Sequence, residues 1–349
     1  MKKVSVYIGT YSYGGSRGIY LSELDLDDAT LSPARLVAEI SDPGYLRYDA
    51  KRRVLFAIGN PAKESLFPAT VASFAVKPDG GLSELSHTII PKVKCCHIAV
   101  NTSYLFAAAY GAAAVVLFPI DSTGRISSAS EVALIEYTKA SAANPERQSE
   151  PHVHSFTPDY KGEYAFVCDF SMDCIRVYRL TDGASKLDCV STAKVADGSG
   201  PRHLIQHPFL ATIYVINELS GTIDAFNFEK GHLSPMQTIS TLPEDFTGKN
   251  TAAEIVISPD GLWLYATNRG DDSIVYYRID AKSGKLERMG WVATQGARPR
   301  NMIIDPSGHY MLVANRDSNN VAVFRMEEGT PTFTGNEIEL SVPMGMAVV

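Results

Sequence analysis

A strand pattern recurs seven times along the chain with a spacing near fifty residues. Each copy is a short run of aromatic and β-branched residues, such as 165–168 (AFVC) or 264–267 (LYAT), followed by a turn and a second run. The steps between successive copies are 49, 50, 60, 48, 51 and 47 residues, counted between the markers Tyr7, Phe56, Phe106, Phe166, Tyr214, Tyr265 and Leu312. Repeats of this length without helical periodicity are typical of β-propellers with one four-stranded sheet per repeat. The sequence therefore predicts an all-β, seven-bladed β-propeller, with residues 1–349 forming a single domain.

Two repeats depart from this pattern. The long step contains the polar segment 141–148 (SAANPERQ), which we interpret as a loop on one face of the ring. In later repeats a shorter strand precedes the marker strand, as in 201–208 (PRHLIQHP), but the first repeat opens directly on its marker strand at Val4. The missing strand is found at the other end of the chain, in Pro343–Val349. We expect this C-terminal strand to pair into the N-terminal blade, which closes the ring and removes free sheet edges.

The charge and cysteine content disfavour several classes of protein. The chain has 32 basic and 39 acidic residues and a net charge of −7, whereas nucleic acids and membrane surfaces attract an excess of Lys and Arg. An anionic small substrate therefore requires a local cluster of arginines. The N-terminal residues alternate like a strand, so we expect a strand there and not a signal peptide. The five cysteines, Cys95, Cys96, Cys168, Cys174 and Cys189, lack disulfide-framework or zinc spacing, so we expect reduced thiols, no metal and a cytoplasmic location.

Charged residues gather where two kinds of strand end meet. In a propeller the inner strand pairs antiparallel with the marker strand, so the start of one and the end of the other share a face near the axis. The starts carry His152, His154, Arg202, His203, Glu254 and Arg300, and the ends carry Asp169, Glu218, Arg269 and Arg316. The first three repeats have Tyr11, Asn60 and Tyr110 at the ends and His97 at a start. An active site is therefore expected off centre, toward the last four blades.

Structural roles are the alternative for many of these residues. Side chains at strand ends are expected to cap turns by bonding to the backbone, namely Asn217, Asn268, Asn315 and Asp169. Glu254 is expected to neutralise a neighbouring arginine, and a structural role is favoured for His203. Large charged groups near an enclosed axis are costly unless they are paired or act on a ligand. For Arg202, Glu218 and Arg269, a salt-bridge network that joins blades remains open beside a role in chemistry.

The chain resembles the lactonase propeller family, which contains bacterial 6-phosphogluconolactonases and fungal-type 3-carboxymuconate lactonizing enzymes. The resemblance runs the full length and is strongest in 151–154 (PHVH), 200–203 (GPRH), 217–219 (NEL), 253–255 (AEI), 258–261 (SPDG), 268–270 (NRG) and 299–301 (PRN). By motif, the active-site group proposed for the lactonizing branch falls on His152 or His154, Arg202, Glu218 and Arg269. The sequence departs from the family at Asp271, where His is frequent, and at 169–171 (DFS), where Asp-Leu-Gly is expected. These departures bear on the substrate more than on the fold.

The resemblance implies a lactonase, with 6-phospho-D-glucono-1,5-lactone as the expected substrate. Hydrolysis without a metal or other cofactor needs a base, positive charge for the oxyanion and a site for the anionic tail. Glu218 or a histidine of the His152/His154 pair is expected to be the base, and Arg202 and Arg269 are expected to bind the oxyanion or the phosphate. Further substrate contacts are expected from His203, Glu254 and Arg300.

Two other functions remain open from the sequence. The same residues could catalyse cycloisomerisation of 3-carboxy-cis,cis-muconate, in which a substrate carboxylate attacks its own double bond. A non-catalytic scaffold is the second alternative, since propellers host many functions, and it predicts an apolar patch on one face. For the enzyme we expect a small anionic lactone as the partner, no nucleic acid or membrane, and a monomer or weak homo-oligomer.

Overall fold

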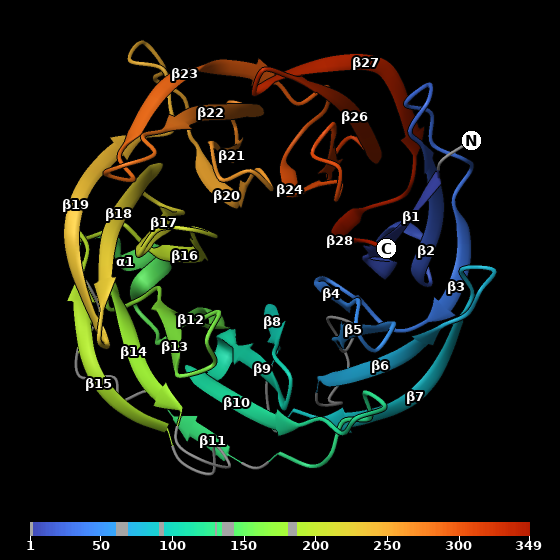
Figure 1. Ribbon diagram of the computed structural model, residues 1–349, viewed down its shortest axis with the longest axis horizontal. Helices are drawn as coiled ribbons and strands as arrows, with labels where there is room; N and C mark the ends of the chain where they lie inside the picture. Colours follow the sequence, from blue (N-terminus) through green and yellow to red (C-terminus); the bar gives the residue numbers. More distant parts are fainter. Residues whose placement is uncertain (1–2, 61–68, 91–93, 130, 135–142, 181–186) are drawn as a thin grey trace.

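The structure is a computed structural model that describes residues 3–60, 69–90, 94–129, 131–134, 143–180 and 187–349. Within these residues, 28 strands form seven four-stranded antiparallel sheets, arranged as blades around a common axis (Figure 1). The expected all-β, seven-bladed propeller is thus confirmed. No helix in the described part of the chain is long and apolar enough to cross a membrane.

In every blade the strands follow one another from the axis outward. The first blade consists, in this order, of β28 (Pro343–Val348), β1 (Lys3–Thr10), β2 (Gly18–Asp25) and β3 (Arg35–Glu39). The second and third blades are β4 (Leu46–Asp49), β5 (Val54–Gly59), β6 (Thr70–Val76) and β7 (Leu82–Ile89), then β8 (His97–Val100), β9 (Tyr104–Ala109), β10 (Ala114–Pro119) and β11 (Glu131–Leu134). The fourth and fifth are β12 (Val153–Pro158), β13 (Tyr164–Asp169), β14 (Cys174–Leu180) and β15 (Leu187–Lys194), then β16 (Pro201–Gln206), β17 (Thr212–Asn217), β18 (Thr222–Glu229) and β19 (His232–Ser240). The sixth and seventh are β20 (Thr251–Ile257), β21 (Trp263–Arg269), β22 (Ser273–Ile279) and β23 (Leu286–Ala293), then β24 (Pro299–Ile304), β25 (Tyr310–Asn315), β26 (Asn320–Glu327) and β27 (Thr330–Glu339).

The hydrophobic core lies between the blades. Among the described residues, seven clusters of buried apolar side chains each join two neighbouring sheets. Successive side chains of a strand point to opposite faces, so Tyr7 packs toward the second blade and Ile8 toward the seventh. The marker strands are covered on both faces, which explains their continuous apolar runs; β5, β17 and β25 are buried throughout.

Tyrosines on three marker strands also bond across the junction between blades. Their hydroxyl groups donate to a turn carbonyl of the next blade, from Tyr7 to Gly80 (2.7 Å), from Tyr214 to Gly284 (2.6 Å) and from Tyr265 to Gly329 (2.9 Å). Buried Tyr hydroxyls normally find such a partner. At three of the seven marker positions the residue thus adds a hydrogen bond between blades to its packing in the core.

Ring closure occurs as expected from the sequence. β28 pairs antiparallel with β1, placing Ile8 opposite Met346 and Val6 opposite Val348. The backbone groups of Ser5 and Val349 exchange two further hydrogen bonds, of 3.1 and 2.8 Å. Met344 and Met346 are 1% and 2% exposed, so the C-terminal strand is a core element, and β28 lies beside β1 on the axis side of the first blade in Figure 1.

The insertion between the third and fourth blades differs from the loop expected for 141–148. Ser141 and Ala142 lie outside the described residues, and the rest of the segment contains the short helix α1 (Pro145–Gln148), which begins with Pro at its first turn, as helices favour. Gln148 is buried, and its Nε2 donates to the carbonyl oxygen of Phe170 (2.7 Å) and to Oδ1 of Asp173 (2.8 Å). These bonds fasten α1 to the turn between β13 and β14.

Candidate active site

A cavity of about 590 Å³ lies at the face of the ring where inner strands begin and marker strands end. Its lining residues are Tyr11, Tyr13, Asp42, Asn60, Lys94, Cys95, Cys96, Tyr110, Arg147, His154, Glu218, Thr251, Arg269, Arg298, Arg300 and Arg316. Six of these side chains are cationic and two are carboxylates, so the lining carries a net charge of +4, in contrast to −7 for the whole chain. The cavity is therefore suited to an anionic ligand.

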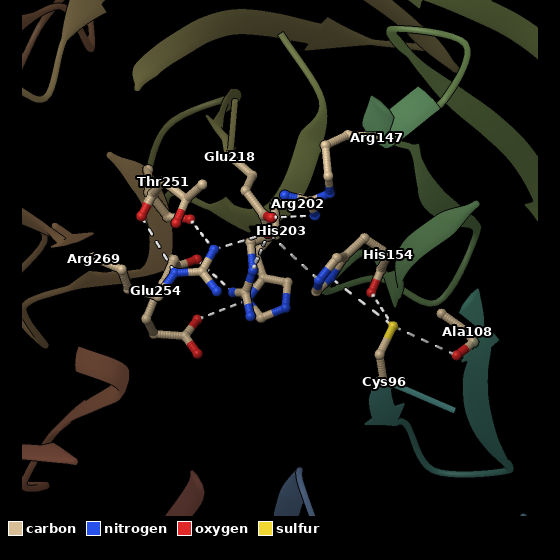
Figure 2. A network of polar contacts seen from close by, with 12 residues as sticks. Cys96, Ala108, Arg147, His154, Arg202, His203, Glu218, Thr251, Glu254 and Arg269 are labelled. Atoms are coloured by element: carbon tan, nitrogen blue, oxygen red, sulfur yellow. Dashed lines mark hydrogen bonds and ion pairs between the residues drawn. The ribbon is translucent and has the colours of Figure 1, made fainter. Parts of the chain in front are cut away.

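Glu218 is the centre of the polar network at this cavity (Figure 2). It directly follows β17, and its backbone N–H donates to the Gly200 carbonyl oxygen (2.8 Å). Oε2 of Glu218 lies 2.9 Å from an Arg269 nitrogen and 3.2 Å from Nε of Arg202, while Oε1 lies 2.7 Å from an Arg147 nitrogen. One carboxylate thus joins arginines from three separate segments of the chain.

Arg202 and Arg269 are buried and held to the backbone of β20. Arg202, 2% exposed, donates to the carbonyl oxygen of Ala253 (2.5 Å). Arg269, 5% exposed, donates to the carbonyl oxygen of Ala252 (2.8 Å). Of the two, Arg269 lines the cavity and Arg202 does not. Both therefore fix the position of Oε2 and have few donor groups left for a ligand.

The charges of this network keep Glu218 ionised. Burial alone raises the pKa of the Glu218 carboxyl group, but the charges of Arg269 and Arg202, with that of Arg147, hold that pKa well below its usual range. Burial lowers the pKa of Arg269 to about 9, despite the opposing effect of Glu218. At neutral pH the site therefore contains a carboxylate among protonated arginines.

The two histidines at the start of β12 occupy different environments. His154 is buried and lines the cavity, with Nε2 4.0 Å from Oε2 of Glu218 and Nδ1 3.9 Å from Sγ of Cys96. Burial, followed by the charge of Arg202, holds the pKa of His154 well below its usual range, so the ring is neutral. His152 stacks on the Tyr110 ring with centroids 4.0 Å apart, and its Nδ1 lies 3.1 Å from the Tyr110 carbonyl oxygen. His152 does not line the cavity.

His203 and Glu254 belong to a buried network beside Arg202 and do not line the cavity. Nδ1 of His203 lies 2.9 Å from Oε1 of Glu254, and Asn301 donates to Oε2 of Glu254 (2.5 Å). The Met346 backbone N–H donates to Asn301 (2.9 Å). Among the described residues Glu254 bonds directly to His203, Asn301 and the Ile255 backbone N–H, and its charge also acts on Arg202, the neighbouring arginine. The network links four inner strands, β16, β20, β24 and β28.

Arg300 projects into the cavity from β24. In the part of the chain that the structure describes, its side chain makes no ion pair, whereas its neighbours Arg298 and Arg316 share the carboxylate of Asp317, at 3.4 and 2.6 Å. A half-buried guanidinium without a counter-ion is a favourable site for a ligand anion.

Of the four side chains expected to cap their turns through backbone bonds, Asp169 does so in the described structure, whereas the three asparagines bond elsewhere. Asp169 accepts from the Met172 backbone N–H (3.1 Å) and pairs with Arg176 (3.0 Å). Asn268 and Asn315 donate to backbone carbonyl oxygens at the end of the preceding blade, those of Thr241 and Thr294, both at 2.8 Å. Asn217 bonds to side chains of its own blade, Thr222 and Asp224.

Several lining residues were not predicted as site residues, and Arg147 is the most prominent. Its position gave one usable signal, because the insertion leads directly into the start of β12, where candidate site residues are expected from the sequence. Lys94 and Arg298 stand in connections without a repeat register, so no pattern indicated them. Cys96 directly precedes β8, and its thiol donates to the His154 carbonyl oxygen (3.1 Å). All five cysteines are free.

No group of three or more His, Cys, Asp or Glu side chains suited to hold a metal ion occurs among the described residues. A reaction without a metal stays a prediction.

Comparison with known proteins identifies the family. Residues 5–349 match the family described as lactonase, 7-bladed β-propeller. The chain is 31% identical to a 6-phosphogluconolactonase of Bacillus subtilis, over 100% of this chain and 98% of that protein, and 35% identical to a 6-phosphogluconolactonase of Formosa agariphila over 67% of each chain. The solved structure of the periplasmic gluconolactonase of Pseudomonas aeruginosa superimposes with a TM-score of 0.93 at 29% identity, covering 100% of this chain and 99% of that one. The chain therefore belongs to the seven-bladed β-propeller lactonase family and is an enzyme of the lactone hydrolase class.

Proposed function

We propose that this enzyme hydrolyses 6-phospho-D-glucono-1,5-lactone to 6-phosphogluconate. The observation that carries the proposal is the cationic cavity around an ionised Glu218. Its volume of about 590 Å³ lies within the range of about 300–1,000 Å³ common for small-molecule sites. The names of the Bacillus and Formosa relatives support the same substrate.

The phosphate is assigned to the wall formed by β24 and the end of β25. Arg300 has no ion pair among the described residues, and Arg298 and Arg316 lie beside it in the lining. Guanidinium groups bind phosphate oxygens through paired N–H donors. With the phosphate here, the lactone ring is assigned to the part of the same cavity that Glu218 and His154 line.

Glu218 is assigned as the base that activates water. Its carboxylate takes a proton from water while the water oxygen bonds to the lactone carbonyl carbon, and the carbonyl electrons move to the exocyclic oxygen. Collapse of this tetrahedral intermediate restores the C=O bond and breaks the bond to the ring oxygen, which takes the proton from Glu218. The new acid then loses its proton to solvent. His154, neutral and 4.0 Å from Glu218, is the alternative proton acceptor.

The remaining predicted residues are assigned supporting roles. Arg202 and Arg269 orient Oε2 of Glu218. His203 and Glu254 hold Arg202 from the buried side, since an Arg202 nitrogen lies 3.1 Å from Nδ1 of His203. His152 supports Tyr110 by stacking. We further propose a cytoplasmic location, which the free, largely buried thiols favour, and a single propeller domain over residues 1–349 that acts as a monomer or weak homo-oligomer.

Turnover of freshly generated 6-phosphogluconolactone, measured against its spontaneous hydrolysis, tests the proposal. We expect clear acceleration by the wild-type enzyme and a loss of about 10²–10⁴-fold in kcat for Glu218→Gln, as for removal of a general base. Glu84→Gln, an exposed substitution on β7, is the matched control and should retain full turnover. A wild-type rate equal to the spontaneous rate, or full activity of Glu218→Gln, would contradict the proposal.

A parallel assay with 3-carboxy-cis,cis-muconate separates the second chemistry that uses these residues. Lactonisation of that substrate without hydrolysis of the phosphorylated lactone would replace the proposed function with a cycloisomerase.

A further inference from the structure

Arg147 differs from the other two arginines that contact Glu218. Its side chain is 40% exposed, against 3% for Arg202 and 5% for Arg269. It contacts Oε1 of Glu218, whereas Arg202 and Arg269 share Oε2. The two carboxylate oxygens therefore have separate surroundings, one enclosed by buried arginines and one that faces a half-exposed arginine.

Among the residues that the structure describes, the contacts of the Arg147 guanidinium are with side chains. Besides Glu218, it interacts electrostatically with the Tyr110 side chain and lies 5.4 Å from the centre of the Phe170 ring. Arg202 and Arg269, by comparison, also donate to backbone carbonyl oxygens of β20. Arg147 can therefore exchange partners by rotation of its own side chain, without breaking a bond to the backbone of a blade.

The backbone that carries Arg147 is nevertheless well anchored. Gln148, the next residue, is buried and bonds to Phe170 and Asp173. Asp173 in turn accepts from the backbone N–H groups of Gly198 (2.7 Å) and Gly200 (2.8 Å), just before β16. The Arg147 guanidinium can therefore move while its backbone stays in place, which suits a side chain that contacts a ligand at one defined position. Both Arg147 and Glu218 line the cavity.

We propose that Arg147 is a further catalytic residue, which leaves Oε1 of Glu218 when substrate binds and donates to the carbonyl oxygen of the lactone. This inference rests on the proposed function, because it assigns the oxyanion contact of that reaction. The exchange frees Oε1 to accept the proton of the attacking water. As the carbonyl electrons move to the exocyclic oxygen, the guanidinium faces the growing negative charge, and its interaction is stronger in the transition state than in the ground state.

Arg147 and Arg300 have different roles in this reaction. Arg147 acts on the carbonyl oxygen, which phosphorylated and neutral lactones share. Arg300 acts on the phosphate, which glucono-1,5-lactone lacks. Substitution of Arg147 should therefore lower kcat for both lactones, while substitution of Arg300 should raise KM for the phosphorylated lactone.

The experiment compares Arg147→Ala, Arg147→Lys and a control on both 6-phosphogluconolactone and glucono-1,5-lactone. We expect Arg147→Ala to lower kcat by about 10- to 100-fold on each lactone, the range for a lost charged hydrogen bond, with a smaller change in KM. Arg147→Lys should restore part of the lost kcat, because the charge remains. Arg288→Ala is the matched control: Arg288 lies over the Trp291 ring at 4.6 Å, on the outer strand β23, and its removal should leave kcat unchanged.

Two results would overturn the inference. Unchanged kcat in Arg147→Ala would show that the pair with Glu218 is dispensable, and a loss confined to KM of the phosphorylated lactone would assign Arg147 to the phosphate instead. If the wild-type enzyme hydrolyses glucono-1,5-lactone but not 6-phosphogluconolactone, the proposed substrate fails by itself. The kcat comparison for Arg147 is then decided on the neutral lactone.

Discussion

The blades of β16–β27 and those of β1–β11 both line the cavity with the starts of inner strands and the ends of marker strands, but the side chains at these positions differ. The first group contributes Glu218, Thr251, Arg269, Arg298, Arg300 and Arg316, and the second contributes Tyr11, Tyr13, Asp42, Asn60, Lys94, Cys95, Cys96 and Tyr110. The packing between blades is alike in both groups, since Tyr7 and Tyr214 are equally buried and bond to the next blade in the same way.

This comparison shows how a repeat fold separates stability from chemistry. Marker residues pack between sheets, where a change in volume is costly. Residues at strand ends face the channel and can differ from blade to blade without disturbing the core. The blades of β16–β27 form the charged wall of the cavity and those of β1–β11 form its tyrosine-rich wall. Both walls have the same architecture, and β28 joins them, because it contacts both β24 and β4.

Deletion of Met344–Val349 should have the largest effect on this arrangement. It removes the strand between the two walls and exposes the edge of β1. Loss of a buried Met side chain costs roughly 2–5 kcal/mol, and Met344 and Met346 are both buried. Together these losses approach the whole stability of a typical domain, about 5–15 kcal/mol. We expect insoluble or unfolded protein, measured by circular dichroism and size-exclusion chromatography. A folded, active truncated enzyme would show that closure is dispensable.

The stability of the charged wall should depend on pH through Glu218. Its folded-state pKa is held below the unfolded value, so ionised Glu218 contributes stability above the unfolded pKa of about 4.3, and that contribution is lost as pH falls through the folded pKa. Glu218→Gln leaves Arg202 and Arg269 buried without their carboxylate, which costs about 3–5 kcal/mol near neutral pH.

Urea denaturation of wild type and Glu218→Gln at pH 7, 5, 4 and 3 measures this dependence. The groups that face the carboxylate are Arg147, Arg202, Arg269 and His154. The gap between the two proteins should be constant from pH 7 to 5 and narrow below about pH 4.3, because the unfolded wild-type chain then binds a proton at residue 218 that the folded protein does not bind until its lower pKa is reached. A gap that stays constant to pH 3 would contradict the assigned charge state.

The smallest effects are expected on KM, for substitution of one residue from each wall. Arg300→Ala should raise KM for 6-phosphogluconolactone by about 10- to 100-fold, since hydrogen bonds to charged groups contribute about 1.5–3 kcal/mol, and leave KM for glucono-1,5-lactone unchanged. Tyr11→Phe, on the other wall, removes one neutral hydroxyl and should change either KM by about fivefold or less. Initial rates on both lactones measure this. Equal effects of the two substitutions would remove the distinction between the walls.

The period, the strands and the ring closure were all predictable from the sequence. These features follow from the local alternation of apolar residues and from the absence of an inner strand in the first repeat, and both can be read from the sequence alone. The same register placed Glu218, Arg269 and Arg300 at strand ends near the axis, and the structure has them in the cavity lining. Their chemical roles remain proposals.

Tertiary structure alone decided which of the candidates face the cavity. Arg202 and Arg300 occupy equivalent positions in their repeats. Arg202 is buried behind the cavity lining, where it contacts Glu218 and the Ala253 carbonyl oxygen, while Arg300 belongs to the lining. Arg147 lies outside the repeat, and its contact with Glu218 joins residues 71 positions apart. Periodicity reports which face of a strand is buried. The partner of a long charged side chain depends on elements that only folding brings within reach.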